Sequence, residues 1–183
     1  MKRTFSVLTQ DNPGVLMRIA SLFYKRNYNI ASLSVSQTNN PGISRFTIVI
    51  DADEWGHDQV EKQLAKLVEV IAVEVLNNGQ FVERWFSLIK VKASIENRPH
   101  ILQVADIFRC RVVDMGSDAL TLEVTGDESK MQACMEALRA YGIMEIAGSG
   151  SVALSRTGFS NEEEYRDSSA GIFGMEYLMA GNQ

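Results

Sequence analysis

The fold is decided by the stretch RTFSVLTQDNPGVL, residues 3–16, which holds a strand, a turn and the start of a helix. Phe5 and Val7 alternate with other side chains, as expected of a β-strand with one buried face. Residues 11–14 are rich in turn formers, and apolar residues then recur at helical spacing up to Phe23. Asn12 is predicted to cap this helix and Pro13 to be its first residue, because a proline loses no hydrogen bond there.

The rest of the first half predicts three more strands and one more helix. In the second strand, residues 28–38, alternate serines form a face that is expected to tolerate water or a polar interface. In the third strand, Phe46, Ile48 and Ile50 alternate strictly. A helix is predicted at 57–66 and a fourth strand at 70–76. This order, β-α-β-β-α-β, is the ferredoxin-like arrangement of a four-stranded antiparallel sheet with two helices on one face.

The second half repeats the same order of elements without recognisable sequence identity. Asn97-Arg98-Pro99 is a cap and first-turn signal between a long apolar strand and a helix. We therefore predict an α+β protein of two tandem ferredoxin-like βαββαβ modules, each a four-stranded antiparallel sheet with helices on one face. The predicted ranges are 1–79 for the first module, 80–156 for the second and 157–183 for an acidic tail.

Charge and hydropathy exclude several classes of protein. The formal net charge is −5, and the tail contributes most of it, with five acidic residues and one basic residue between 157 and 183. The two modules are close to neutral, which argues against a nucleic-acid partner. No apolar run is long enough for a membrane helix, and no signal sequence is recognisable at residues 1–20, so a cytoplasmic protein without a membrane partner is expected.

The residue inventory gives little support for catalysis or metal binding. The two cysteines, Cys110 and Cys134, form no C-x-x-C pair and are expected to be buried thiols of a reducing compartment. His57 and His100 have no nearby ligand partners, so no metal site is predicted. Residues 148–153 fit the pattern G-x-G-x-x-A, but they fall in the last predicted strand, where no helix follows to bind a dinucleotide.

The turn at residues 11–16 is the strongest candidate for a binding site. Backbone N–H groups at a helix N-terminus point outward, and the helix dipole favours an anion there. Gly14 lacks a Cβ and would let a ligand approach the backbone. Asp11 or Asn12 would contact the polar groups of a free amino acid. A plain capped helix start explains the same residues without a ligand, so local features alone leave both interpretations open.

The same residues resemble a known family. Asp-x-Pro-Gly-x-Leu after a first strand is similar to an ACT domain, a small regulatory module that binds amino acids. Over residues 1–156 the chain resembles the small regulatory subunit of acetolactate (acetohydroxyacid) synthase, most specifically in the string RNYNIASLSV at 26–35. Further similar segments are FSVL at 5–8, LF at 22–23, SRFTI at 44–48, EKQLAKL at 61–67, ER at 83–84, LIKV at 88–91, IFR at 107–109 and GSVALSR at 150–156.

The resemblance implies a non-catalytic subunit with defined partners. It implies binding to the large catalytic subunit, activation of that subunit and feedback inhibition by valine, in the biosynthesis of the branched-chain amino acids valine, leucine and isoleucine. Thiamine diphosphate, magnesium and FAD are expected in the catalytic subunit, and no cofactor is expected in this chain. The family's effector site lies between two ACT domains of a homodimer. Residue by residue, it corresponds to Asp11, Asn12, Pro13, Gly14, Val15 and Leu16 of one chain with Asn29 and Ile30 of the other.

Two features depart from the family pattern. Many members carry Asn at the position of Asp11, and a carboxylate there would repel a ligand carboxylate but attract an ammonium group. The acidic tail is the second departure. A different class of function, a stand-alone amino-acid-sensing ACT protein that acts on a transcriptional or other regulatory partner, also fits tandem modules of this kind. An enzyme with its own active site is disfavoured, because acid–base groups do not cluster in the sequence.

Overall fold

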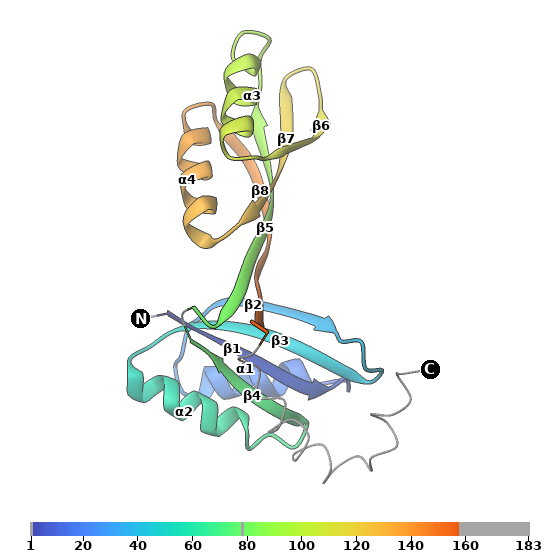
Figure 1. The fold of residues 1–183 in the computed structure, drawn as a ribbon, viewed down its shortest axis with the longest axis vertical. Coiled ribbons are helices and arrows are strands. Elements are labelled where there is room, and N and C mark those ends of the chain that lie inside the picture. Colours follow the sequence, from blue (N-terminus) through green and yellow to red (C-terminus); the bar gives the residue numbers. More distant parts are fainter. Residues whose placement is uncertain (1, 78, 158–183) are drawn as a thin grey trace. The chain divides into compact units, whose positions relative to one another are not determined.

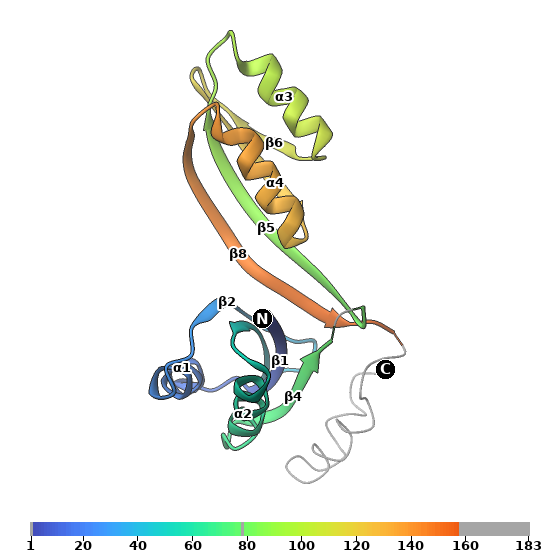
Figure 2. The same cartoon turned by 90° about the vertical axis from the view of Figure 1, so that its left-hand side faces the viewer.

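Two four-stranded antiparallel sheets, each carrying two helices, make up the computed structural model of this chain (Figures 1 and 2). The structure describes residues 2–77 and 79–157, apart from the side chains of residues 54 and 55. The predicted α+β class of two tandem ferredoxin-like βαββαβ modules is confirmed. The predicted tail, beyond Thr157, lies outside the described residues.

The helices and strands follow the predicted order in both halves. The first half contains β1 (Lys2–Gln10), α1 (Val15–Lys25), β2 (Ile30–Gln37), β3 (Ile43–Asp51), α2 (Glu54–Leu64) and β4 (Val70–Leu76). The second half contains β5 (Phe81–Lys92), α3 (Arg98–Ile107), β6 (Arg111–Met115), β7 (Ala119–Gly126), α4 (Glu128–Arg139) and β8 (Ile143–Ser155).

The chain divides into two compact units that are interleaved in sequence. Among the described residues, one unit comprises those up to Val82 and those from Ala153 onward, and the other comprises Glu83–Val152. Within the first unit, Arg156 N–H donates to Gln80 C=O at 2.8 Å and the Ser155 hydroxyl donates to the Glu74 carboxylate. The modules predicted from the sequence, 1–79 and 80–156, are two contiguous ranges with a single boundary between them. These ranges remain a prediction.

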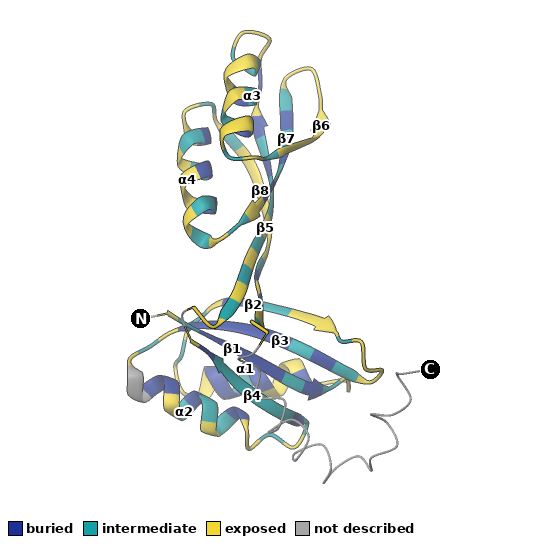
Figure 3. Cartoon of the chain, in the orientation of Figure 1, coloured by how far each residue is buried: buried dark blue, intermediate teal, exposed yellow. Residues whose placement is uncertain are grey.

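In the first unit, β1 lies inside the sheet and organises the other strands. The strand order is β2-β3-β1-β4, so β2 and β4 are the edges. Phe5 pairs with Ile48 on one side of β1 and with Val75 on the other, both antiparallel. Phe5, Val7, Phe46, Ile48 and Ile50 all face the helices and are at most 3% exposed, which confirms their predicted alternation (Figure 3).

The opposite face of this sheet is mostly polar and partly buried, which fits the expected serine face that tolerates water or a polar interface. Ser32 of β2 is only 7% exposed, Ser34 is intermediate and Ser36 is exposed. Ser6 and Thr47, which pair across β1 and β3, are also buried. The guanidinium of Arg45 donates to the Ser6 hydroxyl at 2.6 Å, which compensates for the removal of that hydroxyl from water.

The helices of the chain begin in different ways. Asp53 and Asp127 cap α2 and α4, because their carboxylates accept hydrogen bonds from the Gly56 and Lys130 N–H groups at 2.7 and 2.8 Å. Hydrogen bonds from the backbone of Lys130 and the hydroxyl of Ser129 lower the pKa of Asp127. Helix α3 begins after Asn97 as predicted, but the Asn97 side chain makes no capping hydrogen bond.

The core of the second unit contains both cysteines of the chain. Cys134 on α4 is fully buried, and Cys110 at the start of β6 is half-buried, with 3.7 Å between their Sγ atoms. A hydrogen bond from the Cys134 thiol, with the ammonium of Lys130 nearby, lowers the pKa of Cys110. The same hydrogen bond and burial raise the pKa of Cys134. The two thiols are therefore expected to differ in reactivity, although neither of them forms a disulfide.

We predict that iodoacetamide alkylates Cys110 of the folded chain well before Cys134. The thiolate is the reacting species, and a lowered pKa populates it at lower pH than the value of about 8.5 of a free cysteine. Peptide mass mapping over a pH series measures the two rates. In Cys134→Ala the stabilising hydrogen bond is lost, so the alkylation of Cys110 is expected to shift to higher pH. Equal rates at the two cysteines, or no shift in this variant, would contradict the assignment.

We also predict that a chain ending at Thr157 keeps both folded units. Each sheet is complete by Ser155, and all residues of both described cores precede Leu154. Urea unfolding followed by circular dichroism is expected to stay cooperative, because the tail completes neither sheet and neither core. Loss of the cooperative transition would show that the tail completes a core.

Candidate functional site

The loop that joins β1 to α1, residues 11–14, is anchored at its first residue and exposed thereafter. Gln10 N–H donates to Glu69 C=O at 2.9 Å, and Asp11 N–H donates to Gly42 C=O at 2.8 Å. These bonds tie the end of β1 to the turns before β4 and β3. Residues 11–14 are exposed, whereas Val15 is 5% exposed and packs in the core. The loop is therefore a fixed, accessible rim around the start of α1.

Gly14, rather than Asn12, occupies the N-cap position of α1, whose first residue is Val15. Its φ of +91° lies in the left-handed region, which costs a residue with a Cβ about 1–2 kcal/mol. The predictions that Asn12 caps the helix and that Pro13 is its first residue are therefore wrong. The turn needs one left-handed residue before the helix, so the helix starts two residues later than the proline signal indicates.

The start of α1 is open to a ligand. No side chain caps it, and the first intrahelical bond runs from Arg18 N–H to Gly14 C=O. Val15 N–H donates to Asn12 C=O at 3.4 Å, so the N–H groups of Leu16 and Met17 are the ones left without a helical acceptor. A Cβ built on Gly14 would meet no atom within 4 Å. The helix dipole adds a partial positive charge at this end. The arrangement suits a carboxylate that approaches Gly14, Val15 and Leu16.

A carboxylate and two amides lie on the rim of the same loop. The Gln37 side-chain amide, at the end of β2, donates to Asp11 Oδ2 at 2.9 Å. The Asn12 amide donates to the Gln10 side chain at the same distance. Gln37 is not among the residues predicted for the site. It lies 26 positions after Asp11, and only the pairing of β2 with β3 brings the two side chains together. Asp11 is thus oriented, with its other oxygen available to an ammonium group.

The structure separates the predicted site residues into two places within one chain. Asp11, Asn12, Pro13, Gly14, Val15 and Leu16 follow the end of β1. Asn29 and Ile30 lie at the start of β2, where Ile30 pairs with Ile50 and Ile50 pairs with Arg3. Arg3 and Gln10 are seven residues apart on β1, or about 23 Å at 3.3 Å per residue. One chain alone therefore does not bring the two groups together.

The other sequence motifs form no second site. Residues 148–153, which fit G-x-G-x-x-A, lie within β8 and open no helix. In the described part of the chain, no three His, Cys, Asp or Glu side chains gather in a group that could hold a metal ion. None of the helices within residues 2–77 and 79–157 has both the length and the apolar character needed to cross a bilayer.

Two family profiles match the chain, one over each half. Residues 5–72 match the ACT domain of the small-subunit type of acetohydroxyacid synthase (AHAS), described as "AHAS small subunit-like ACT domain". Residues 84–157 match the profile "Small subunit of acetolactate synthase". Together the two profiles cover most of the described chain and fall on the two βαββαβ halves.

Individual relatives agree with the profiles. A probable acetolactate synthase small subunit of Archaeoglobus fulgidus is 46% identical over 156 residues, covering 85% of this chain and 98% of the relative. The acetolactate synthase small subunit of Mycolicibacterium smegmatis is 43% identical over 153 residues, 84% of this chain and 90% of the relative.

A solved structure is similar as well. The crystal structure of the acetolactate synthase small subunit from Thermotoga maritima matches with a TM-score of 0.80 and 36% identity, over 85% of this chain and 98% of that one. Both the sequence and the fold are therefore shared over nearly the full length of these relatives. The chain belongs to the acetolactate synthase small subunit family.

Proposed function

We propose that this chain is the non-catalytic regulatory subunit of acetolactate synthase and that residues 11–16 bind its amino-acid effector. The proposal is that it binds the large catalytic subunit, raises its activity and makes it sensitive to feedback inhibition by valine. The reaction would belong to the biosynthesis of valine, leucine and isoleucine in the cytoplasm. The observation that carries the effector site is the uncapped, glycine-led start of α1 next to an oriented carboxylate.

The polarity of the loop suits a zwitterion. The carboxylate of a free amino acid would accept hydrogen bonds from the N–H groups at the start of α1, where the helix dipole also favours a negative charge. Its ammonium group would lie against the Asp11 carboxylate, which the Gln37 amide holds in place. Leu16 is 49% exposed beside the loop and offers an apolar contact for a branched side chain.

A homodimer would complete the site. β2 is an edge strand, and its outer edge is available for pairing. If the β2 strands of two copies pair antiparallel, the Gln37 end of one strand lies beside the Ile30 end of the other. This arrangement brings Asn29 and Ile30 of the second copy to the loop at residues 11–16. Such pairing accounts for the separation of about 23 Å between the two groups within one chain.

In this proposal the cofactors belong to the partner. Thiamine diphosphate, magnesium and FAD would be bound by the large catalytic subunit, and this chain would act on that subunit through contacts. The face that contacts the catalytic subunit is proposed to be the exposed strand surface of the first unit, separate from the effector loop. Activation and inhibition would then be separable by mutation.

We predict that the purified chain makes no acetolactate from pyruvate, even with thiamine diphosphate and magnesium. Added to a catalytic subunit, it is expected to raise the rate and to make that rate fall when valine is added. Colorimetric measurement of acetolactate, with the chain alone, the catalytic subunit alone and the mixture, tests each part. Turnover by the chain alone would refute the regulatory assignment. Copurification with a transcriptional protein instead of a large thiamine-diphosphate enzyme would favour the stand-alone sensor.

A matched pair of variants at Gly14 tests the effector site. Gly14→Asp and Gly14→Asn place side chains of the same size at the same left-handed residue, so they share the strain of about 1–2 kcal/mol. Only the aspartate adds a negative charge facing the ligand carboxylate. At about 4 Å this repulsion costs on the order of 1–4 kcal/mol, or roughly tenfold to several-hundredfold in affinity.

The readout is the rate of the reconstituted enzyme against valine concentration. Gly14→Asp is expected to need far more valine for half-inhibition than Gly14→Asn, while both variants still activate the catalytic subunit. Urea unfolding of both variants checks that the strain is shared. Equal valine responses in the two variants would remove this loop from the effector site. Loss of activation in both would show that the two functions use one surface.

A further inference from the structure

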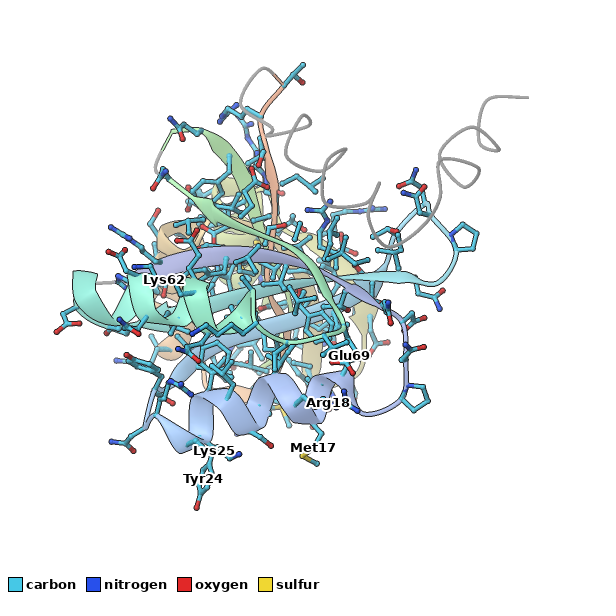
Figure 4. All side chains as sticks on the ribbon, turned by 90° about the horizontal axis from the view of Figure 1, so that it is seen from below. Met17, Arg18, Tyr24, Lys25, Lys62 and Glu69 are labelled. Carbon is cyan, nitrogen blue, oxygen red and sulfur yellow. The ribbon has the colours of Figure 1, made fainter. Side chains whose placement is uncertain are left out.

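An open groove of about 450 Å³ is lined by α1, from Met17 to Arg26, and by the end of α2 and the residues that follow it, and it contains none of the proposed effector residues 11–16. Met17, Leu22 and Leu67 give it an apolar lining. Met17 is 69% exposed, and the neighbouring Tyr24 and Val68 are 85% and 84% exposed. Figure 4 shows Met17 and Tyr24 projecting from the outer side of α1. An apolar groove with further exposed apolar side chains next to its lining in sequence is typical of an interaction surface.

The groove is rimmed by cationic side chains. Lys25, Arg26 and Lys66 line it, and the described residues provide none of the three with an ion-pair partner. Arg18 also lines it but is paired with Glu69, and Figure 4 shows these two side chains together at one end of α1. An apolar groove with unpaired cations at its rim fits a partner that carries carboxylates followed by apolar residues.

The chain itself contains such a segment. Residues 158–183 begin with the acidic run Glu162-Glu163-Glu164, followed by Asp167, and continue with an apolar cluster that includes Ile172 and Phe173. This segment has five acidic residues and one basic residue, so it holds most of the net charge of −5. The A. fulgidus relative matches over 98% of its own length but over only 85% of this chain, and the small-subunit profile ends at residue 157. The segment is therefore an addition to that pattern.

The segment starts from the first unit, which is the unit that contains the groove. Ser155 and Arg156 contact Glu74 and Gln80 of the first unit, which also contains the groove. Glu74 lies on β4, whose first residue, Val70, follows the groove residues Lys66 and Leu67 closely in the chain. Five to seven residues separate Thr157 from the acidic run, a reach of up to roughly 16–25 Å, and the apolar cluster reaches farther.

We propose that residues 158–183 bind in the α1–α2 groove of the same chain, with Glu162–Glu164 against Lys25, Arg26 and Lys66 and the apolar cluster along Met17 and Leu67. The proposed interaction is intramolecular. It does not depend on the proposed effector site, because it involves no amino-acid ligand and none of residues 11–16.

Zero-length cross-linking of the full-length chain tests the proposal. A carbodiimide joins a carboxylate to a lysine amine in direct contact, with loss of water, so it reports the proposed ion pairs. An equal mixture of ¹⁴N- and ¹⁵N-labelled chains distinguishes links within a chain from links between chains by mass. We expect Glu162–Glu164 to be linked to Lys25 and Lys66. Both peptides of each linked pair should carry the same nitrogen isotope, because they come from one chain. We expect these links to be lost in 1 M salt, where the Debye length is about 3 Å.

Two charge reversals provide a matched control. Arg26 caps the end of α1 and Arg139 is the last residue of α4, so each reversal places a glutamate at a helix C-terminus. Arg26→Glu removes a groove cation but keeps both linkable lysines, and it is expected to abolish the links to Lys25 and Lys66. Arg139→Glu, in the other unit, is expected to leave them unchanged.

Three results would overturn the proposal. Mixed-isotope links to Lys25 and Lys66 would assign the groove to a second copy of the chain. Links from the acidic run that favour lysines of the second unit, such as Lys92, over Lys25 and Lys66 would place the tail elsewhere. Equal loss of the links in Arg26→Glu and Arg139→Glu would show that the contact depends on the net charge of the chain and not on binding in this groove.

Discussion

The left-handed backbone at Gly14 is the constraint on which the first unit depends. β1 lies inside its sheet, so the chain must leave it and start α1 across the sheet face within four residues. A φ of +91° at Gly14 achieves this reversal and lets Val15 enter the core at the first helical position. The same conformation leaves the helix start without a side-chain cap. The fold and the proposed binding loop therefore both favour glycine at position 14, where a residue with a Cβ would cost about 1–2 kcal/mol.

Most of the fold could be predicted from the sequence, because burying one face of a strand or helix imposes a regular spacing on the apolar residues. Strict alternation at Phe46, Ile48 and Ile50 identified β3, and β4 begins and ends at the predicted residues. Helix starts were less predictable, because a cap depends on backbone geometry and not only on residue type. Asn12 and Pro13 are favourable start signals, yet the turn places the start at Gly14. Asp53 and Asp127 cap their helices in sequences that also suit loops.

The candidate site was only partly predictable, and the missing part is long-range. The loop at residues 11–16 is contiguous, so its turn and helix signals are readable locally. Gln37 contacts Asp11 only because β2 and β3 pair in one particular register, and a slip by one residue would turn its amide to the other face. The burial of Ser32 and Ser6 on the polar face was unpredictable for a related reason, because a serine is compatible with water or with a protein partner such as Arg45.

The interleaving of the two units has a consequence for the order of events during synthesis. All four strands of the first sheet are made before any residue of Glu83–Val152, but the residues from Ala153 that belong to the same unit are made after it. At about 5–20 residues per second, roughly 4–14 s pass between the two segments. The contacts of Ser155 and Arg156 with Glu74 and Gln80 are therefore formed after the four strands of the first sheet have been made, and a ribosome-bound chain would lack them until residues 155 and 156 have left the ribosome.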